Sequence, residues 1–136
     1  DKAETALSLG VNAMVQDPVT PDVLYAATTR GIFKTTNRAA SWFPLSVANE
    51  KGDLFVSSFV MDPERPQVLY ASSTRGIFKS SDGGLSWIPI NQGLTNTHVR
   101  TLVIHPKNRR VLYAGTHGGL FKTQDEGMNW TAVPFR

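Results

Sequence analysis

The sequence predicts an all-β fold of three four-stranded antiparallel sheets, arranged as blades of a β-propeller. A Val-Leu-Tyr-Ala segment, a Gly-Ile-Phe-Lys or Gly-Leu-Phe-Lys segment and a tryptophan follow one another three times in 136 residues. The repeated tyrosines, Tyr25, Tyr70 and Tyr113, are 45 and 43 residues apart. A period of roughly 40–45 residues is typical of one propeller blade. Such a repeat determines architecture more than activity, because propellers host many unrelated functions.

Composition indicates a globular chain. Hydrophobic residues make up 40% of the sequence and charged residues 18%, and the absence of cysteine excludes disulfides and thiolate metal sites. No apolar run approaches the roughly 18 residues that a membrane helix needs, so we expect a soluble chain without a membrane span. The net charge is +3. Its one local concentration, Lys107 with Arg109 and Arg110, lacks interleaved aromatics, so nucleic acid is not an expected partner.

The repeats divide the chain into three blades. We expect a lead-in at residues 1–10, blades at 11–46, 56–91 and 99–135, and connections at 47–55 and 92–98. The predicted inner strands are apolar at nearly every position, as expected of strands buried between neighbouring blades. They cover Val11–Gln16, Val56–Met61 and Val99–Ile104. Each ends at a proline turn, where the residue before the proline leaves the helical region.

Two longer strands and a short outer strand follow in each blade. The second strands are expected at Val23–Ala27, Val68–Ser72 and Val111–Gly115, and the third, after a glycine turn, at Ile32–Thr35, Ile77–Ser80 and Leu120–Thr123. Because side chains alternate along a strand, the repeated phenylalanine of the third strand is expected to be buried, with the following lysine on the opposite face. The repeated tyrosines are expected in the core, and the outer strands begin around the tryptophans.

The turn before each outer strand carries the most specific motif. Two copies fit S/T-x-D-x-G-x-x-W, with Ser80, Asp82, Gly84 and Trp87 in one and Thr123, Asp125, Gly127 and Trp130 in the other. The carboxylate can accept backbone N–H groups across its own turn, the glycine permits a positive φ, and the tryptophan buries a large area. In the first blade Asn37, Ala39 and Trp42 take these places, so we expect a looser turn of the same kind.

With these motifs, residues 11–135 resemble the Asp-box, or BNR-repeat, β-propellers. This group includes sialidases, xyloglucan-active glycosidases, the sortilin ectodomain and photosystem II assembly factors. The resemblance implies that Asp82 and Asp125 build turns at the periphery, away from the active or binding face. It also slightly favours a secreted or periplasmic location.

Three blades are too few to close a ring, because single-chain propellers typically have about four to eight. An open arc leaves strand edges and the apolar flanks of its end blades uncovered. We therefore expect either a homodimer, in which two copies join head to tail as a six-bladed ring, or further blades supplied by a longer chain.

A ligand is expected on one face of the arc, which we call the loop face. This face is formed by the turns between second and third strands and by the connections to the next inner strand. Its candidate ligand-binding residues are Arg30, Arg75, His117, Arg100, Thr29 and Thr74, and the connections add Asn49, Glu50, Lys51, Asn96, Thr97 and His98. Arg100 aligns with Asn12 and Ser57, near the start of the inner strands. Arginine and histidine suit a carboxylate, a phosphate or an acidic partner surface, the alternative being ordinary solvated turns.

Catalytic, metal and cofactor sites are not predicted. A sialidase needs a unique tyrosine nucleophile with acidic partners, whereas the tyrosines here repeat within the core. Asp17 and Asp62 fall in turns on the opposite face, and Glu50 and Asp53 lie too close together in one connection to flank a glycosidic bond. The histidines at 98, 105 and 117 lie on separate elements, a pattern that does not favour metal binding.

The favoured hypothesis is a non-catalytic propeller module that binds a protein or glycan through its loop face. One alternative is a fragment of a glycosidase-type propeller, sialidase-like or xyloglucanase-like, whose catalytic residues lie on other blades. Another is a purely structural or engineered self-assembling repeat without a ligand.

Overall fold

The computed structural model describes residues 8, 10–47 and 54–134, which form three four-stranded antiparallel sheets. The first sheet contains β1 (Val11–Gln16), β2 (Leu24–Thr28), β3 (Gly31–Thr35) and β4 (Phe43–Leu45). The second contains β5 (Val56–Met61), β6 (Leu69–Ser73), β7 (Gly76–Ser80) and β8 (Ile88–Pro89). The third contains β9 (Val99–Ile104), β10 (Leu112–Thr116), β11 (Gly119–Thr123) and β12 (Trp130–Ala132). The predicted all-β fold of propeller blades is confirmed.

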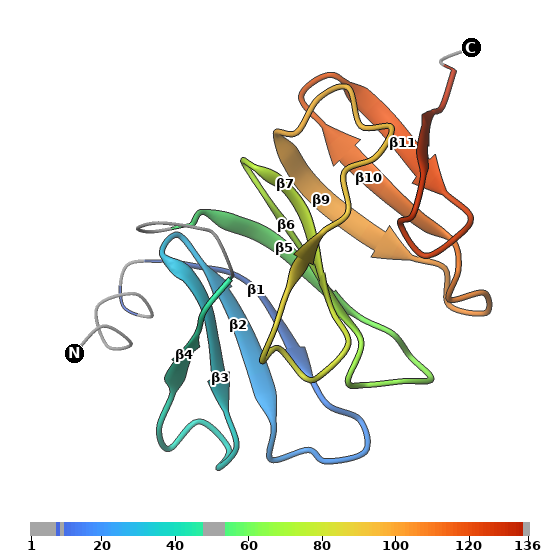
Figure 1. Ribbon diagram of the computed structural model, residues 1–136. Coiled ribbons are helices and arrows are strands. Elements are labelled where there is room, and N and C mark those ends of the chain that lie inside the picture. The colour runs from blue at the N-terminus through green and yellow to red at the C-terminus, as the bar shows by residue number, and fades with distance from the viewer. Residues whose placement is uncertain (1–7, 9, 48–53, 135–136) are drawn as a thin grey trace.

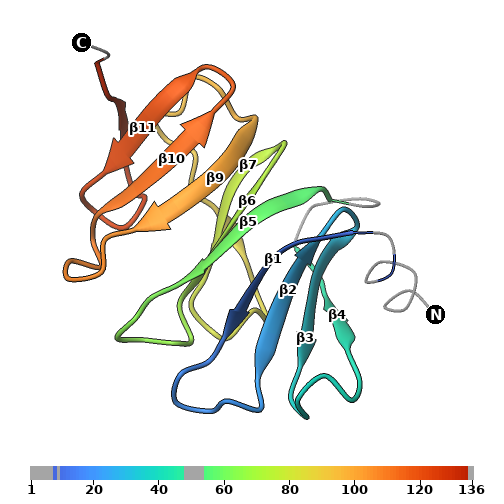
Figure 2. The same cartoon turned by 180° about the vertical axis from the view of Figure 1, so that it is seen from behind.

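The sheets follow one another along an arc, with the second sheet between the first and the third (Figure 1). Within each sheet the strands lie in chain order. The inner strands β1, β5 and β9 contact one another in that order, and the view from behind shows the same arrangement (Figure 2). Within the described ranges, no helix is long and apolar enough to cross a lipid bilayer.

The observed strands differ from the predicted ones by single residues at their ends. The inner strands coincide with their predicted ranges. The second strands begin one residue late, because the backbone N–H of Val23, Val68 and Val111 closes the preceding turn on the carbonyl three residues earlier. The third strands begin one residue early, at a glycine of positive φ that pairs with the last residue of the second strand.

Strand register places each repeated tyrosine opposite the repeated lysine. Tyr25 pairs with Lys34, and the corresponding pairs in the other blades are Tyr70 with Lys79 and Tyr113 with Lys122. Each lysine Nζ lies over the ring of its tyrosine, 5.1, 5.6 and 5.7 Å from the centroid in chain order, which is cation–π distance. The phenylalanines between them, Phe33, Phe78 and Phe121, are buried as predicted.

The hydrophobic core lies between successive sheets. At the first joint, the Tyr25 ring stacks on Phe59 with centroids 5.5 Å apart, and the Trp87 ring packs nearly perpendicular to Phe59 with centroids 5.9 Å apart. At the second joint, the buried side chain of Trp130 packs in a cluster that contains Tyr70 and Ile77. Each joint therefore receives the tyrosine of one blade and the tryptophan of the next.

The end blades correct two expectations about burial. Val56 and Phe59 of β5 are buried, but Val11 and Met14 at the equivalent places in β1 are 41% and 50% exposed. Tyr113 is likewise only half-buried, unlike the other two tyrosines. The inner strands and the tyrosines are therefore not buried throughout, because the first and third blades each have a neighbouring sheet on one side only.

The proline turns after the inner strands share one hydrogen-bonding device. Asp17 Oδ1 accepts the backbone N–H groups two and three residues later at 2.8 and 3.1 Å, and Asp62 Oδ1 does the same at 2.9 and 3.2 Å. In the third blade His105 takes this position, and its Nδ1 accepts the two N–H groups at 3.0 and 3.1 Å. An imidazole nitrogen thus replaces a carboxylate oxygen without loss of the turn.

Candidate ligand pocket on the loop face

A pocket of about 510 Å³ opens on the loop face. Its lining comes from all three blades and consists of Asn12, Phe55, Ser57, Thr74, His98, Val99, Arg100 and His117. The starts of the inner strands form its floor, and the β6–β7 and β10–β11 turns contribute Thr74 and His117. The pocket therefore lies where the inner strands converge.

Three lining residues occupy the same position in successive inner strands. Asn12 Nδ2 donates to the carbonyl of Val56 at 2.8 Å, and Ser57 Oγ donates to the carbonyl of Val99 at 2.8 Å. Each side chain thus ties its blade to the next one. Arg100 holds this position in the last blade, where it is exposed at the pocket.

His98 and His117 form a stacked pair in the pocket wall. Their ring centroids lie 3.7 Å apart with the planes inclined by 13°. The backbone N–H of His117 donates to the carbonyl of His98 at 3.1 Å, and Asn96 Oδ1 accepts the backbone N–H of His98 at 3.0 Å. Desolvation of the ring, followed by the nearby charges of His98 and Arg100, lowers the pKa of His117.

The described lining consists of six polar side chains, the phenyl ring of Phe55 and the aliphatic side chain of Val99. Arg100 brings a guanidinium, the histidines bring two imidazoles, and the remaining polar groups are an amide and two hydroxyls. Such a set can bind a carboxylate or phosphate. A glycosidase instead requires two carboxyl groups that flank the scissile bond, and no carboxyl group lies among the described lining residues. Glu50 and Asp53, with Asn49 and Lys51, lie outside the described residues.

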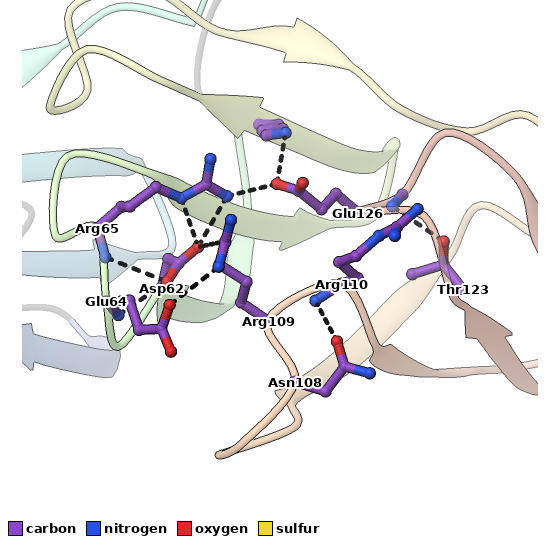
Figure 3. A network of polar contacts seen from close by, with 10 residues as sticks. Asp62, Glu64, Arg65, Asn108, Arg109, Arg110, Thr123 and Glu126 are labelled. Carbon is purple, nitrogen blue, oxygen red and sulfur yellow. Dashed lines mark hydrogen bonds and ion pairs between the residues drawn. The ribbon is translucent and has the colours of Figure 1, made fainter.

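Carboxylates instead gather at the opposite face, at the joint between the second and third sheets (Figure 3). Asp62 is fully buried and accepts from Nε and Nη2 of Arg65 at 3.1 and 3.0 Å. Arg65 Nη2 also donates to Glu126 Oε1 at 2.6 Å across the joint, and Arg109 Nη1 donates to Glu64 Oε2 at 2.9 Å. These carboxylates connect two blades and do not face the pocket.

The motif aspartates act within their own turns. Asp82 Oδ1 accepts the hydroxyl of Ser80 at 2.8 Å and the backbone N–H of Ser86 at 2.9 Å. Asp125 makes the same two contacts in the third blade. Asn37 Oδ1 also makes them, at 2.8 and 2.9 Å, so the hydrogen bonds of the first turn match those of the others.

These hydrogen bonds lower the pKa of both aspartates to about 2. For Asp82 the main causes are the hydroxyl and the backbone N–H of Ser86, and for Asp125 the hydroxyl of Thr123 followed by the Asn129 amide. Both turns, β7–β8 and β11–β12, lie at the opposite ends of their strands from the β6–β7 and β10–β11 turns of the loop face. Because the carboxyl groups of Asp82 and Asp125 stay ionised and hydrogen-bonded within their own turns, their role is structural.

The structure brings together half of the predicted ligand-binding residues. Thr74, Arg100 and His117 line the pocket, whereas Thr29, Arg30 and Arg75 are not among its described lining residues. His98, expected on this face, also lines it. Asn12, Ser57 and Phe55 were not predicted as ligand-binding residues. Asn12 and Ser57 align with Arg100 in the repeats, and this alignment could have identified both as ligand-binding candidates.

Comparison with known proteins supports the fold. No protein-family model matches the sequence, and no curated protein matches it. An ancestral GH74 enzyme superposes with a TM-score of 0.76 at 20% identity, over 92% of this chain and 18% of that one. The GH74 xyloglucanase from Xanthomonas campestris gives 0.74 at 17% identity, over 94% and 24%. YCF48 bound to a D1 peptide gives 0.72 at 17% identity, over 91% and 39%.

The chain thus spans well under half the length of the solved structures that it matches. At these identities the likeness concerns the fold alone. The extracellular domain of a one-component system from B. thetaiotaomicron shares it as well, with a TM-score of 0.69 at 19% identity over 93% of this chain. Similar blades therefore occur in GH74 enzymes, in a peptide-bound protein and in the extracellular domain of a one-component system. From its three sheets and these neighbours, the chain comprises three blades of a β-propeller.

Proposed function

We propose that the chain is a non-catalytic binding module of the Asp-box type, which takes an anionic group of a protein or glycan ligand in the pocket on its loop face. The observation that carries the proposal is the convergence of Arg100 with the stacked His98 and His117 in one pocket. Ring completion by further blades or a partner is part of the proposal, because three blades leave two ends of the arc uncovered.

The charged groups of the pocket explain the preference for an anion. A guanidinium can bind a carboxylate or phosphate with two parallel hydrogen bonds. The pKa of His117 is lowered in the free protein, in part by the positive charge of Arg100. A bound anion offsets that charge and favours the protonated imidazole. Affinity should therefore rise as the pH falls through the pKa of His117.

The pocket also offers an apolar contact. Phe55 is 43% exposed and lines the pocket beside Ser57 and Val99. An exposed aromatic ring next to hydrogen-bond donors suits the apolar face of a sugar or a peptide side chain. In the proposal Thr29, Arg30 and Arg75 form an outer rim on the same face, since they occupy the equivalent β2–β3 and β6–β7 turns.

A second candidate is a glycosidase-type propeller, favoured by the structural likeness to GH74 enzymes. In that case the paired carboxylates come from outside the described residues, and the pocket contributes only to substrate binding. Hydrolysis of sialosides or xyloglucan by this chain would support this candidate over a non-catalytic module.

Binding to a glycan array and to an acidic-peptide array tests the proposal. We expect acidic members to bind, and Arg100→Ala with His117→Ala to weaken their binding by at least about tenfold through the lost charge-assisted hydrogen bonds. Lys107→Ala is the matched control, because Lys107 is exposed in the β9–β10 turn and is not among the described lining residues of the pocket. Unchanged binding by the double variant would exclude the pocket. Silence of both arrays would leave a purely structural repeat.

A further inference from the structure

We propose that two copies of this chain close one ring head to tail, with the free side of the first sheet docked on the free side of the third. We call the free side of the first sheet the leading face, with Val11, Met14, Asp22 and Ala39. The free side of the third sheet is the trailing face, with Tyr113, Leu120, Lys122 and Val133. This inference does not depend on the ligand proposed above.

The leading face exposes side chains that are buried wherever a preceding blade is present. Val11 is 41% exposed, while its equivalents Val56 and Val99 are 0% and 1% exposed. Met14 is 50% exposed, while its equivalents Phe59 and Leu102 are each 4% exposed. The first sheet thus carries the apolar half of a joint whose other half is not in the described chain.

The trailing face carries the complementary half of the same joint. Leu120 is 44% exposed, whereas Ile32 and Ile77 at its position are 1% and 0% exposed. Tyr113 is half-buried, while Tyr25 and Tyr70 are buried in the two internal joints. A head-to-tail contact between two copies covers both kinds of face at once, as a cyclic dimer requires.

The internal joints also show where charged groups would meet. Lys34 Nζ and the Tyr25 hydroxyl both donate to the carbonyl of Gly83 in the next blade, each at 3.2 Å. Lys79 Nζ reaches Glu126 Oε1 at 3.4 Å across the second joint. Within the described residues, the side-chain ammonium of Lys122 contacts only the Tyr113 ring.

The leading face supplies acceptors at the matching places. Arg38 occupies the position of Gly83, so its backbone carbonyl would face Lys122 and Tyr113 of the other copy. Asp22 occupies the position of Gln67, which lines a crevice with Tyr25, Lys34 and Gly83. The Asp22 carboxylate, which already pairs with Arg38 in its own copy, would therefore also lie beside the Lys122 ammonium of the other copy.

Side-chain size at two positions favours a second copy as the occupant. A Cβ on Gly84 would lie 2.6 Å from Leu45 Cδ1, and one on Gly127 would lie 2.4 Å from Ile90 Cδ1. The position of these glycines is alanine in the first blade, Ala39. The position of Leu45 and Ile90 is valine in the third, Val133, which has no Cδ1. Compared with the internal joints, the leading face has one extra methyl group at Ala39 and the trailing face lacks one at Val133. The two changes compensate for each other in a close-packed joint.

Ring closure would also complete the pocket. Asn12 and Ser57 each donate to the carbonyl of the first residue in the next inner strand, Val56 and Val99. Arg100 is the third member of this series, and the next carbonyl is that of Val11 in the second copy. The ligand pocket would then have equivalent copies on both halves of one ring.

Sedimentation velocity at micromolar concentration tests the assembly. We expect the chain to sediment at twice its 14.9 kDa mass. Leu120→Asp and Met14→Asp should each raise the dissociation constant by at least about 100-fold, because each buries a charge at both joints. Leu85→Asp is the matched control, since Leu85 is 74% exposed in a β7–β8 turn away from both faces. A monomeric wild-type chain, or dissociation by only one of the two variants, would overturn the proposal.

Mixing the two variants tests the head-to-tail arrangement. A chain with Met14→Asp retains a native trailing face, and one with Leu120→Asp retains a native leading face. Their mixture should form a heterodimer through one native joint, although neither dimerises alone. Absence of the heterodimer, with both chains folded by circular dichroism, would contradict the arrangement.

A size exchange tests whether Ala39 and Val133 meet. Val133→Ile restores the Cδ1 of the internal joints and should weaken the dimer by about tenfold through overpacking against Ala39. Ala39→Gly in the same chain should restore the wild-type dissociation constant. An unchanged dimer in Val133→Ile, or no recovery in the double variant, would show that another occupant covers these faces.

Discussion

Trp130 is hydrogen-bonded to Ile90 across the joint between the second and third blades. Its indole Nε1 donates to the Ile90 carbonyl at 2.8 Å, and the ring is 3% exposed. Trp87 has the same burial but donates to Gly84 within its own blade at 2.9 Å. Trp87 and Trp130 thus each fill a joint between blades and donate to different carbonyls, whereas Trp42 of the first blade is only half-buried.

Replacing Trp130 should show how much of the joint is packing and how much is this hydrogen bond. Trp130→Ala should lower the free energy of unfolding by about 3–5 kcal/mol, because it removes a buried aromatic. Trp130→Phe keeps a ring but leaves the Ile90 carbonyl unpaired, so we expect a loss of about 1–3 kcal/mol. Urea unfolding measures both. Equal losses for the two variants would contradict this division.

His105 should tolerate aspartate and not leucine. Its Nδ1 accepts two backbone N–H groups, as Asp17 and Asp62 do through a carboxylate oxygen. His105→Asp should therefore leave the free energy of unfolding within about 0.5 kcal/mol. His105→Leu leaves both N–H groups without their acceptor and should cost about 1–2 kcal/mol. Urea unfolding at neutral pH compares them, and a silent leucine variant would exclude a structural role for the ring.

Acid should destabilise the chain through the turn aspartates. The pKa values of Asp82 and Asp125 are lowered to about 2 from an ordinary 3.8. Because the folded-state pKa is depressed, the stabilisation is present above the ordinary value and is lost as the pH falls through the folded-state value. Melting temperature should therefore fall between about pH 4 and pH 2.

Asparagine provides the control for this acid effect. Asn37 already makes the same hydrogen bonds without a titrating group. The variant with Asp82→Asn and Asp125→Asn should retain the fold and show a shallower decline of melting temperature over that pH range. A slope equal to that of the wild-type chain would assign the acid sensitivity to other carboxylates.

The first turn should gain stability from a glycine. Ala39 has a φ of 72°, in the left-handed region, where the equivalent residues Gly84 and Gly127 carry no Cβ penalty. Ala39→Gly should raise the free energy of unfolding by about 0.5–1 kcal/mol, the relief of strain less the entropy cost of glycine. Measurement in the Leu120→Asp background removes any contribution from assembly. Gly84→Ala is the opposite control and should destabilise, because its Cβ would meet Leu45 Cδ1.

Most of the fold was predictable, and the pocket was predictable in part. Alternation and turn chemistry placed the strands within one residue, since both are local properties of the chain. Thr74, Arg100 and His117 were predicted from the topology of a blade. Phe55 was not, because a residue just before an inner strand lines a pocket only when neighbouring blades bring their strands together.

The sequence by itself determined the repeating blade, the turn chemistry and the placement of Tyr, Phe and Trp in it, because these depend on spacings within one repeat. Only the tertiary structure decided which copies of the repeat are buried. Val11 and Val56 occupy the same position in their repeats, but Val11 is 41% exposed and Val56 is 0% exposed. Burial depends on whether another blade is present on that side, and this is a property of the packed arc that no single repeat contains.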